Sequence, residues 1–139
     1  MLEFLKKGVF KGTDEFLEQQ SNKLILKTSE KTFDSPSFDV VIDEIDKISE
    51  NATRNYEQVK AGKKTYFVSL EYVGKSFIQA TFIQNFDECL YHIEYMKDIS
   101  DCLVKSVDDV DVSEVKNLFK SFYENKPLNE KLEWEDLNI

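Results

Sequence analysis

The only histidine of the chain, His92, stands three residues after Cys89, one of its two cysteines. Imidazole and thiolate groups bind zinc and carry out nucleophilic catalysis, so this pair is the first candidate for chemistry. Helical spacing over residues 86–98 predicts that both side chains share one helix face, with Cys102 close enough in sequence to fold back on them. The local charge disfavours a reactive thiolate, because three acidic residues surround the pair: Asp87, Glu88 and Glu94.

A zinc site at these residues is not supported by the spacing. A closed structural site needs four ligands, and the Cys-x-x-Cys pairs that usually supply them are missing. We therefore expect Cys89 and Cys102 to pack as small apolar side chains. The sequence predicts no catalytic residue, no metal ligand and no cofactor.

Two further motifs resemble known sites only in part. Gly74-Lys75-Ser76 resembles the end of a phosphate-binding P-loop, but position 69 is serine instead of glycine and the flanking segments have strand character. Asp109-x-Asp111-x-Ser113 resembles the opening of a calcium loop, whose position 6 is glycine and position 12 glutamate. Here those positions hold Glu114 and Lys120. We interpret the first motif as a hairpin turn and the second as the acidic start of a helix.

Hydrolytic chemistry has no specific support in the sequence. The chain has 27 Asp and Glu residues among 139, so close carboxylate pairs are expected by chance. No serine lies in a G-x-S-x-G elbow. We therefore predict that the protein is not an enzyme, and a small metal-independent enzyme with His92 as its base remains the weaker alternative.

The elements that must position these residues follow from apolar spacing. Ser35 before Pro36 predicts a helix start, and an apolar stripe continues to Ala61-Gly62, which gives a helix over 36–60. Besides the helix at 86–98, a helix that begins at Asp111 or Ser113 should end near Glu124. One or two short helices are expected within residues 1–20.

The strongest strand signal is a β-hairpin, with strands at 65–73 and 76–83 joined by Gly74-Lys75. Alternation in the first strand directs four side chains to the core: Tyr66, Val68, Leu70 and Tyr72. Residues 23–28 are short and β-prone and are predicted to form a further strand, and residues 102–104 are expected to start another.

These elements predict one α+β domain over residues 1–139, with a small antiparallel sheet built around a central β-hairpin and packed by three to five helices. The segment 125–139 is expected to be either a short helix or a loosely held acidic tail. Two cysteines favour a reducing compartment, and no apolar run exceeds three residues. We therefore expect a soluble, cytoplasmic protein that does not enter a membrane.

Acidic residues concentrate in the second half of the chain. Eighteen basic and 27 acidic residues give a net charge of −9, and residues 76–139 carry −8 of it. Such a field repels nucleic acid and attracts basic proteins. The residues that we predict to bind a partner are Asp108, Asp109, Asp111, Glu133, Trp134, Glu135 and Asp136.

A binding function follows from this charge distribution. We expect an immunity protein or antitoxin that blocks a basic toxin or nuclease domain, because nuclease clefts are basic where they hold phosphates. A phage-encoded inhibitor of a defence nuclease and a non-catalytic adaptor subunit are the alternatives. Direct nucleic-acid binding and a small-molecule ligand are not expected. Two simpler explanations stay open: the acidic runs are solvated faces, and Trp134 packs on this protein's own core.

Overall fold

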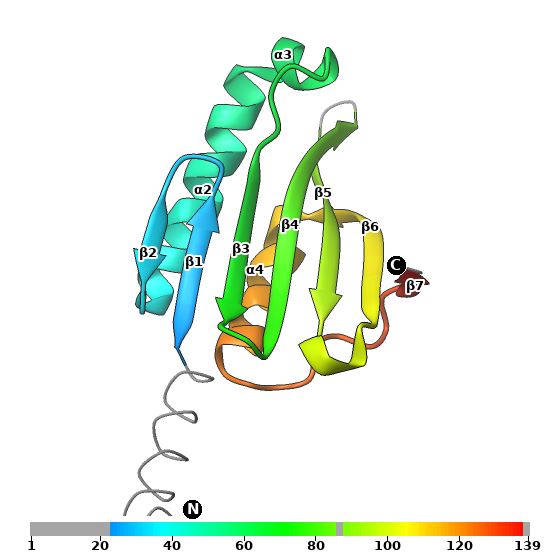
Figure 1. Ribbon diagram of the computed structural model, residues 1–139. Helices are drawn as coiled ribbons and strands as arrows, with labels where there is room; N and C mark the ends of the chain where they lie inside the picture. Colours follow the sequence, from blue (N-terminus) through cyan, green and yellow to red (C-terminus); the bar gives the residue numbers. More distant parts are fainter. Residues whose placement is uncertain (1–22, 86–87, 138–139) are drawn as a thin grey trace, which may run out of the picture.

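The computed structural model describes residues 23–85 and 88–137 (Figure 1). Its strands form one antiparallel sheet in the order β2-β1-β3-β4-β5-β6-β7. They are β1 (Leu24–Thr28), β2 (Thr32–Asp34), β3 (Phe67–Tyr72), β4 (Ser76–Asn85), β5 (Glu88–Met96), β6 (Val104–Asp111) and β7 (Glu135–Leu137). Three α-helices lie in the described residues: α2 (Phe38–Arg54), α3 (Tyr56–Lys60) and α4 (Val112–Tyr123). The predicted α+β class is confirmed, with a larger sheet than expected.

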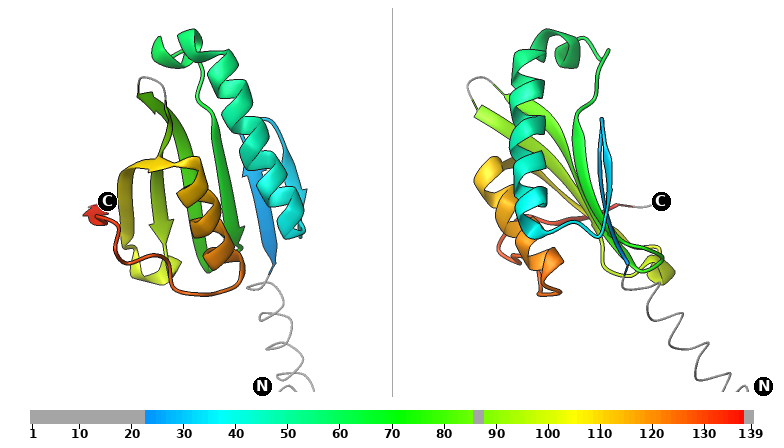
Figure 2. Two further views of the ribbon diagram at one scale, coloured as in Figure 1. Left: turned by 180° about the vertical axis from the view of Figure 1, so that it is seen from behind. Right: turned by 90° about the vertical axis from the view of Figure 1, so that its left-hand side faces the viewer.

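Helices α2 and α4 pack on the same face of this sheet, as the two views of Figure 2 show. Apolar side chains fill the space between the helices and the sheet, among them Ile45 and Ile48 of α2, Leu118 and Phe119 of α4, and Leu70, Ile78, Tyr91 and Ile93 of the sheet. No helix in the described ranges covers the opposite face, and none there is long and apolar enough to cross a bilayer.

Strands β3 and β4 form a hairpin and are the third and fourth of the seven strands in the sheet. Leu70 pairs with Ile78, and Gly74 in the connecting turn has a φ of 73°, a conformation that glycine adopts without steric strain. Val68 and Leu70 are fully buried under the helices. The predicted assignment of the two strand faces is therefore confirmed.

Helix α2 begins two residues later than predicted. Its N-cap is Ser37, whose side chain accepts a hydrogen bond from the backbone N–H of Val40 at 3.4 Å. Ser35, the predicted cap, instead has a left-handed backbone with a φ of 47°, so the chain is still turning away from β2 at that point. The predicted apolar stripe is buried as expected, at Val41, Ile45, Ile48 and Ala52.

The helix predicted over 36–60 is interrupted at Asn55. This residue leaves the helical conformation, with φ −107° and ψ 29°, and α3 begins after it. The Asn55 side chain donates hydrogen bonds to the backbone oxygen of Asn51 at 3.1 Å and to the hydroxyl of Tyr66 at 2.9 Å. The second of these bonds connects the end of α2 to Tyr66, in the chain that leads into β3.

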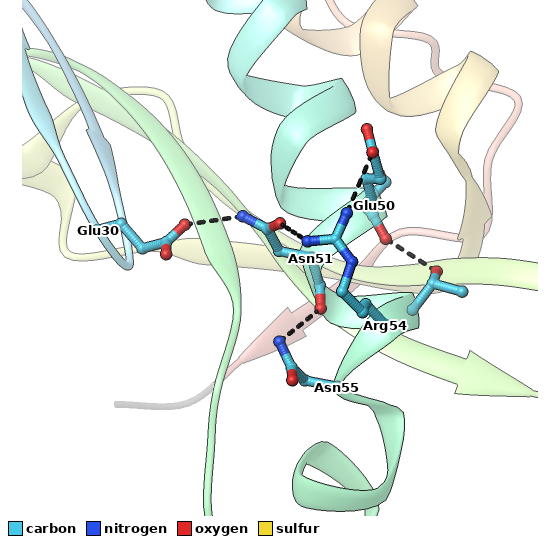
Figure 3. Close-up of polar contacts among 7 residues, drawn as sticks. Glu30, Glu50, Asn51, Arg54 and Asn55 are labelled. Carbon is cyan, nitrogen blue, oxygen red and sulfur yellow. Dashed lines mark hydrogen bonds and ion pairs between the residues drawn. The ribbon is translucent and has the colours of Figure 1, made fainter.

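A network of exposed polar side chains surrounds the same helix end (Figure 3). Arg54 donates to Asn51 at 3.2 Å and forms an ion pair with Glu50 at 3.2 Å, while Asn51 donates to Glu30 at 3.1 Å. Glu30 lies in the turn between β1 and β2, so the network connects the end of α2 to that turn. Its role is structural.

The predicted helix at 86–98 is wrong, because Glu88–Met96 form β5. Apolar residues on both faces of this strand imitate helical spacing, but pairing with β4 on one side and β6 on the other decides the conformation. Tyr91 and Ile93 are buried under the helices. Cys89 and His92 therefore lie on opposite faces of the sheet, since strand side chains alternate.

Near the end of the chain Glu135–Leu137 form the strand β7, where the sequence analysis expected either a short helix or a loosely held acidic tail. Asp111 caps α4 by accepting from the N–H of Glu114 at 2.8 Å, so of the two expected cap residues it is the one used. After α4 the chain runs to β7, which pairs with β6, and Leu128 on the way is buried. The short helices predicted within residues 1–20 lie outside the described residues.

Candidate functional site

The predicted acidic residues lie on or next to β6 and β7, the two strands at one edge of the sheet; Figure 1 shows the position of these strands. We call this group the acidic edge: Asp108, Asp109, Asp111, Glu133, Glu135 and Asp136. Pairing of Ser106 with Glu135 and of Lys105 with Asp136 brings β7 against β6. The lining of a shallow hollow of about 330 Å³ includes four of the acidic-edge residues, Asp108, Asp109, Asp111 and Glu133, together with Glu114 and one basic residue, Lys131. The fold thus brings together two acidic segments that are separate in the sequence.

A β-bulge orients two of these carboxylates. Tyr91 pairs with Val110 and Ile93 with Val107, so Asp108 and Asp109 of β6 stand opposite the single residue His92 of β5. Asp109 has a left-handed backbone with a φ of 58°, which aspartate tolerates better than most residues. The Asp108 side chain is 67% exposed. The bulge therefore adds an exposed carboxylate to this edge of the sheet.

The His92 ring lies between two carboxylates. Its Nδ1 is 2.5 Å from Oδ1 of Asp108, and its Nε2 is 3.1 Å from Oε2 of Glu94. Burial lowers the pKa of His92, but hydrogen bonds with Asp108 and Glu94 outweigh this effect and raise the pKa above its usual value. Both ring nitrogens are engaged, so neither is free to take a proton from a substrate.

Trp134 packs against this protein's own core. Its indole N–H donates to the backbone oxygen of Asn129 at 2.8 Å, and its ring centre lies 6.1 Å from that of Tyr95. The ring is only partly buried. Trp134 therefore connects the chain before β7 to the sheet, and its remaining surface faces a larger pocket.

That pocket has a volume of about 920 Å³, and the sequence analysis did not predict it. We call it the lysine pocket after the four lysines that line it: Lys75, Lys97, Lys105 and Lys126. Apolar and aromatic side chains also line it: Tyr95, Phe122, Leu128 and Trp134. The acidic side chains in its lining are Glu130 and Glu133.

The four lysines differ in how they are paired. Lys105 contacts Asp136 at 3.0 Å and Lys126 contacts Glu124 at 3.2 Å, both in exposed ion pairs that contribute little to stability. Within residues 23–85 and 88–137, neither Lys75 nor Lys97 has a carboxylate within 4.0 Å. Neither is therefore held in a direct ion pair there, although the charge of Lys75 contributes to lowering the pKa of the nearby Asp98 carboxylate.

No sequence signal could have identified this pocket. Its residues come from the β3–β4 turn, β5, β6, the end of α4 and the chain before β7. Each lysine taken alone looks like an ordinary surface residue. The sequence analysis placed Tyr95 and Lys97 in a helix. In the structure Tyr95 is in β5 and Lys97 directly follows it, so both lie next to the turn between β3 and β4.

The remaining candidate motifs have structural roles. Gly74-Lys75 lies in the turn of the predicted hairpin, and Asp111 caps α4 by accepting a hydrogen bond from the backbone N–H of Glu114. Cys89 and Cys102 are not disulfide-bonded, and Cys89 lies 3.4 Å from the Thr53 hydroxyl. Among the described residues, no three His, Cys, Asp or Glu side chains are placed to hold a metal ion.

Comparison of the chain with protein-family models, with curated proteins and with solved structures gave no match.

Proposed function

We propose that this protein is a small acidic cytoplasmic inhibitor that binds a basic protein and covers its functional surface, as an immunity protein or antitoxin covers a toxin or nuclease domain. The observation that supports the proposal is the acidic edge. Asp111 and Glu133 are 22 positions apart in the sequence, yet both line the same hollow. Carboxylates from two segments therefore act on a partner as one charged surface.

The electrostatics of the acidic edge suit a partner that normally holds phosphates. Nuclease clefts are basic, and an inhibitor with the opposite potential is steered into them. Asp108 and Asp136 are 67% and 59% exposed, and although His92 and Lys105 offset part of their charge, their carboxylates remain accessible to an approaching protein. Exposed charges are screened over about 8 Å at physiological salt, so binding should weaken as salt rises.

Two alternatives would use the chain differently. A non-catalytic adaptor subunit would bind through the same edge without blocking its partner's activity, so an activity assay of the partner separates the two. A metal-independent enzyme based on His92 is less well supported, because Asp108 and Glu94 hold both nitrogens of the ring.

The test removes charge from β6 without disturbing the fold. The triple variant Asp108→Asn, Asp109→Asn and Asp111→Asn keeps a residue that tolerates the left-handed backbone and a residue that caps α4. Association with basic nuclease domains, including any encoded beside this protein's gene, is measured by surface plasmon resonance at two salt concentrations. We expect association to slow by about tenfold or more at low salt, and the partner's nuclease activity to return.

The matched control removes the same charge from the exposed helical residues Asp39, Asp43 and Glu57, as Asp39→Asn, Asp43→Asn and Glu57→Gln. It should leave the association rate within about twofold, because these side chains lie away from the acidic edge. If both triple variants slowed association equally, the effect would come from the net charge of the protein and not from the acidic edge. An affinity that neither salt nor the β6 variant changes would contradict the proposal.

A further inference from the structure

The lysine pocket has the size of a site for a small organic ligand. Its volume of about 920 Å³ lies within the range of roughly 300 to 1,000 Å³ that such sites occupy in proteins. Aromatic side chains from β5, α4 and the chain before β7 meet there, with Tyr95 6.3 Å from Phe122 and 6.1 Å from Trp134 between ring centres. These rings offer an apolar surface on which a planar group can stack.

The charge of the pocket opposes the charge of the protein. Four lysines and two glutamates line it, whereas the whole chain has a net charge of −9. Lysine ammonium groups bind phosphate as point charges. Lys75 and Lys97 lie at the same end of the sheet, Lys75 just before β4 and Lys97 just after β5. Neither has a carboxylate within 4.0 Å among the described residues. A cationic group of this kind is a place for an anion.

We propose that the lysine pocket binds an organic phosphate with a planar aromatic ring, the size of a mononucleotide. The ring would lie against Tyr95, Phe122 and Trp134, and the phosphate would contact Lys75 and Lys97. The acidic edge limits the ligand to a compact anion, because Glu133 lines both sites and repels a long polyphosphate chain. This site is separate from the protein-binding function proposed above, and either can fail without the other.

The chain provides its own reporter for this ligand. Trp134 is the only tryptophan, and its ring lines the pocket, so ligand stacking should change its fluorescence. The full-length protein is titrated with AMP, ATP, adenosine, inorganic phosphate, a single-stranded oligonucleotide and a poly-glutamate peptide. We expect a saturable change with AMP below about 1 mM, weaker binding of ATP because of its longer phosphate chain, and binding at least tenfold weaker than that of AMP for adenosine or phosphate alone.

A pair of double variants locates the site. Lys75→Ala with Lys97→Ala should weaken nucleotide binding about tenfold or more, whereas Lys60→Ala with Lys63→Ala removes the same charge from α3 and the turn after it and should leave binding unchanged. Equilibrium dialysis with radiolabelled nucleotide repeats the measurement without relying on the tryptophan. Thermal unfolding of both double variants checks that they remain folded.

Several results would overturn the proposal. They are the absence of saturable binding for AMP, equal loss in the two double variants, and adenosine or phosphate that binds as tightly as AMP. If the oligonucleotide or the poly-glutamate peptide bound more tightly than AMP, the ligand of the pocket would be a nucleic acid or an acidic protein segment, and the proposal of a small ligand would be wrong.

Discussion

The acidic edge and the lysine pocket lie next to each other and share Glu133 in their linings, yet they carry opposite charge. The acidic edge is built from two continuous segments of the chain, so its residues could be identified in the sequence. The lysine pocket takes most of its lining from the segment 122–134, but three of its four lysines, Lys75, Lys97 and Lys105, come from separate places along the sheet. The negative net charge of the chain indicated the acidic edge but gave no sign of the lysine pocket.

This difference teaches how far a charge count can be trusted. A net charge of −9 describes the average field far from the protein, where acidic residues dominate. Close to the surface the field depends on the nearest groups, because screening at physiological salt limits exposed charges to about 8 Å. Both sites can therefore act on different partners of opposite sign.

Both sites depend on the same central hairpin, so a core variant should affect them together. Leu70→Ala removes a fully buried side chain and leaves a cavity, which should lower the free energy of unfolding by about 2 to 5 kcal/mol. Urea denaturation measures this. The control is Leu103→Ala, at a side chain that is 49% exposed, where the change should stay within about 0.5 kcal/mol. Equal stability of the two variants would contradict the observed burial.

Trp134 lines the lysine pocket and follows Glu133, which lines both sites, so its substitution tests whether Trp134 contributes to both kinds of binding. Trp134→Ala removes the ring from Tyr95 and the hydrogen bond to Asn129, and should speed dissociation of a basic partner, at a cost of about 2 kcal/mol in binding. Calorimetry should also show weaker nucleotide binding. Trp134→Phe keeps an aromatic ring and should retain most of the affinity for the basic partner and for the nucleotide. A loss confined to the nucleotide would remove Trp134 from the protein-binding surface.

The smallest expected effect concerns His92 beneath the acidic edge. Its pKa is raised in the folded protein, so its protonation stabilises the fold fully below its unfolded pKa of about 6.5, and the stabilisation is lost as pH rises through the higher folded value. His92→Gln should therefore cost more stability at about pH 5.5 than at about pH 8.5, by roughly 0.2 to 1 kcal/mol because the partners are exposed. Denaturant unfolding at the two pH values tests the sign, and a larger cost at high pH would contradict it.

Local sequence signals determined much of the fold. Gly74-Lys75 between two β-branched and aromatic runs predicted the hairpin, and the apolar stripes predicted most of α2 and α4. The prediction of these elements was correct because one face of each is buried and the other is exposed, so apolar residues recur in the sequence with the period of a helix or a strand. The segment 86–98 failed because β5 carries apolar residues on both faces, which removes the alternation that identifies a strand.

The sequence by itself determined the hairpin, the main helices and the acidic character of the second half of the chain. These depend on spacing and composition within short segments. The tertiary structure alone decided that Asp111 and Glu133 share a hollow, that Cys89 and His92 face opposite ways, and that Lys75 and Lys97 line one pocket. Strand pairing between distant segments sets these neighbours, and no local pattern records which strands pair.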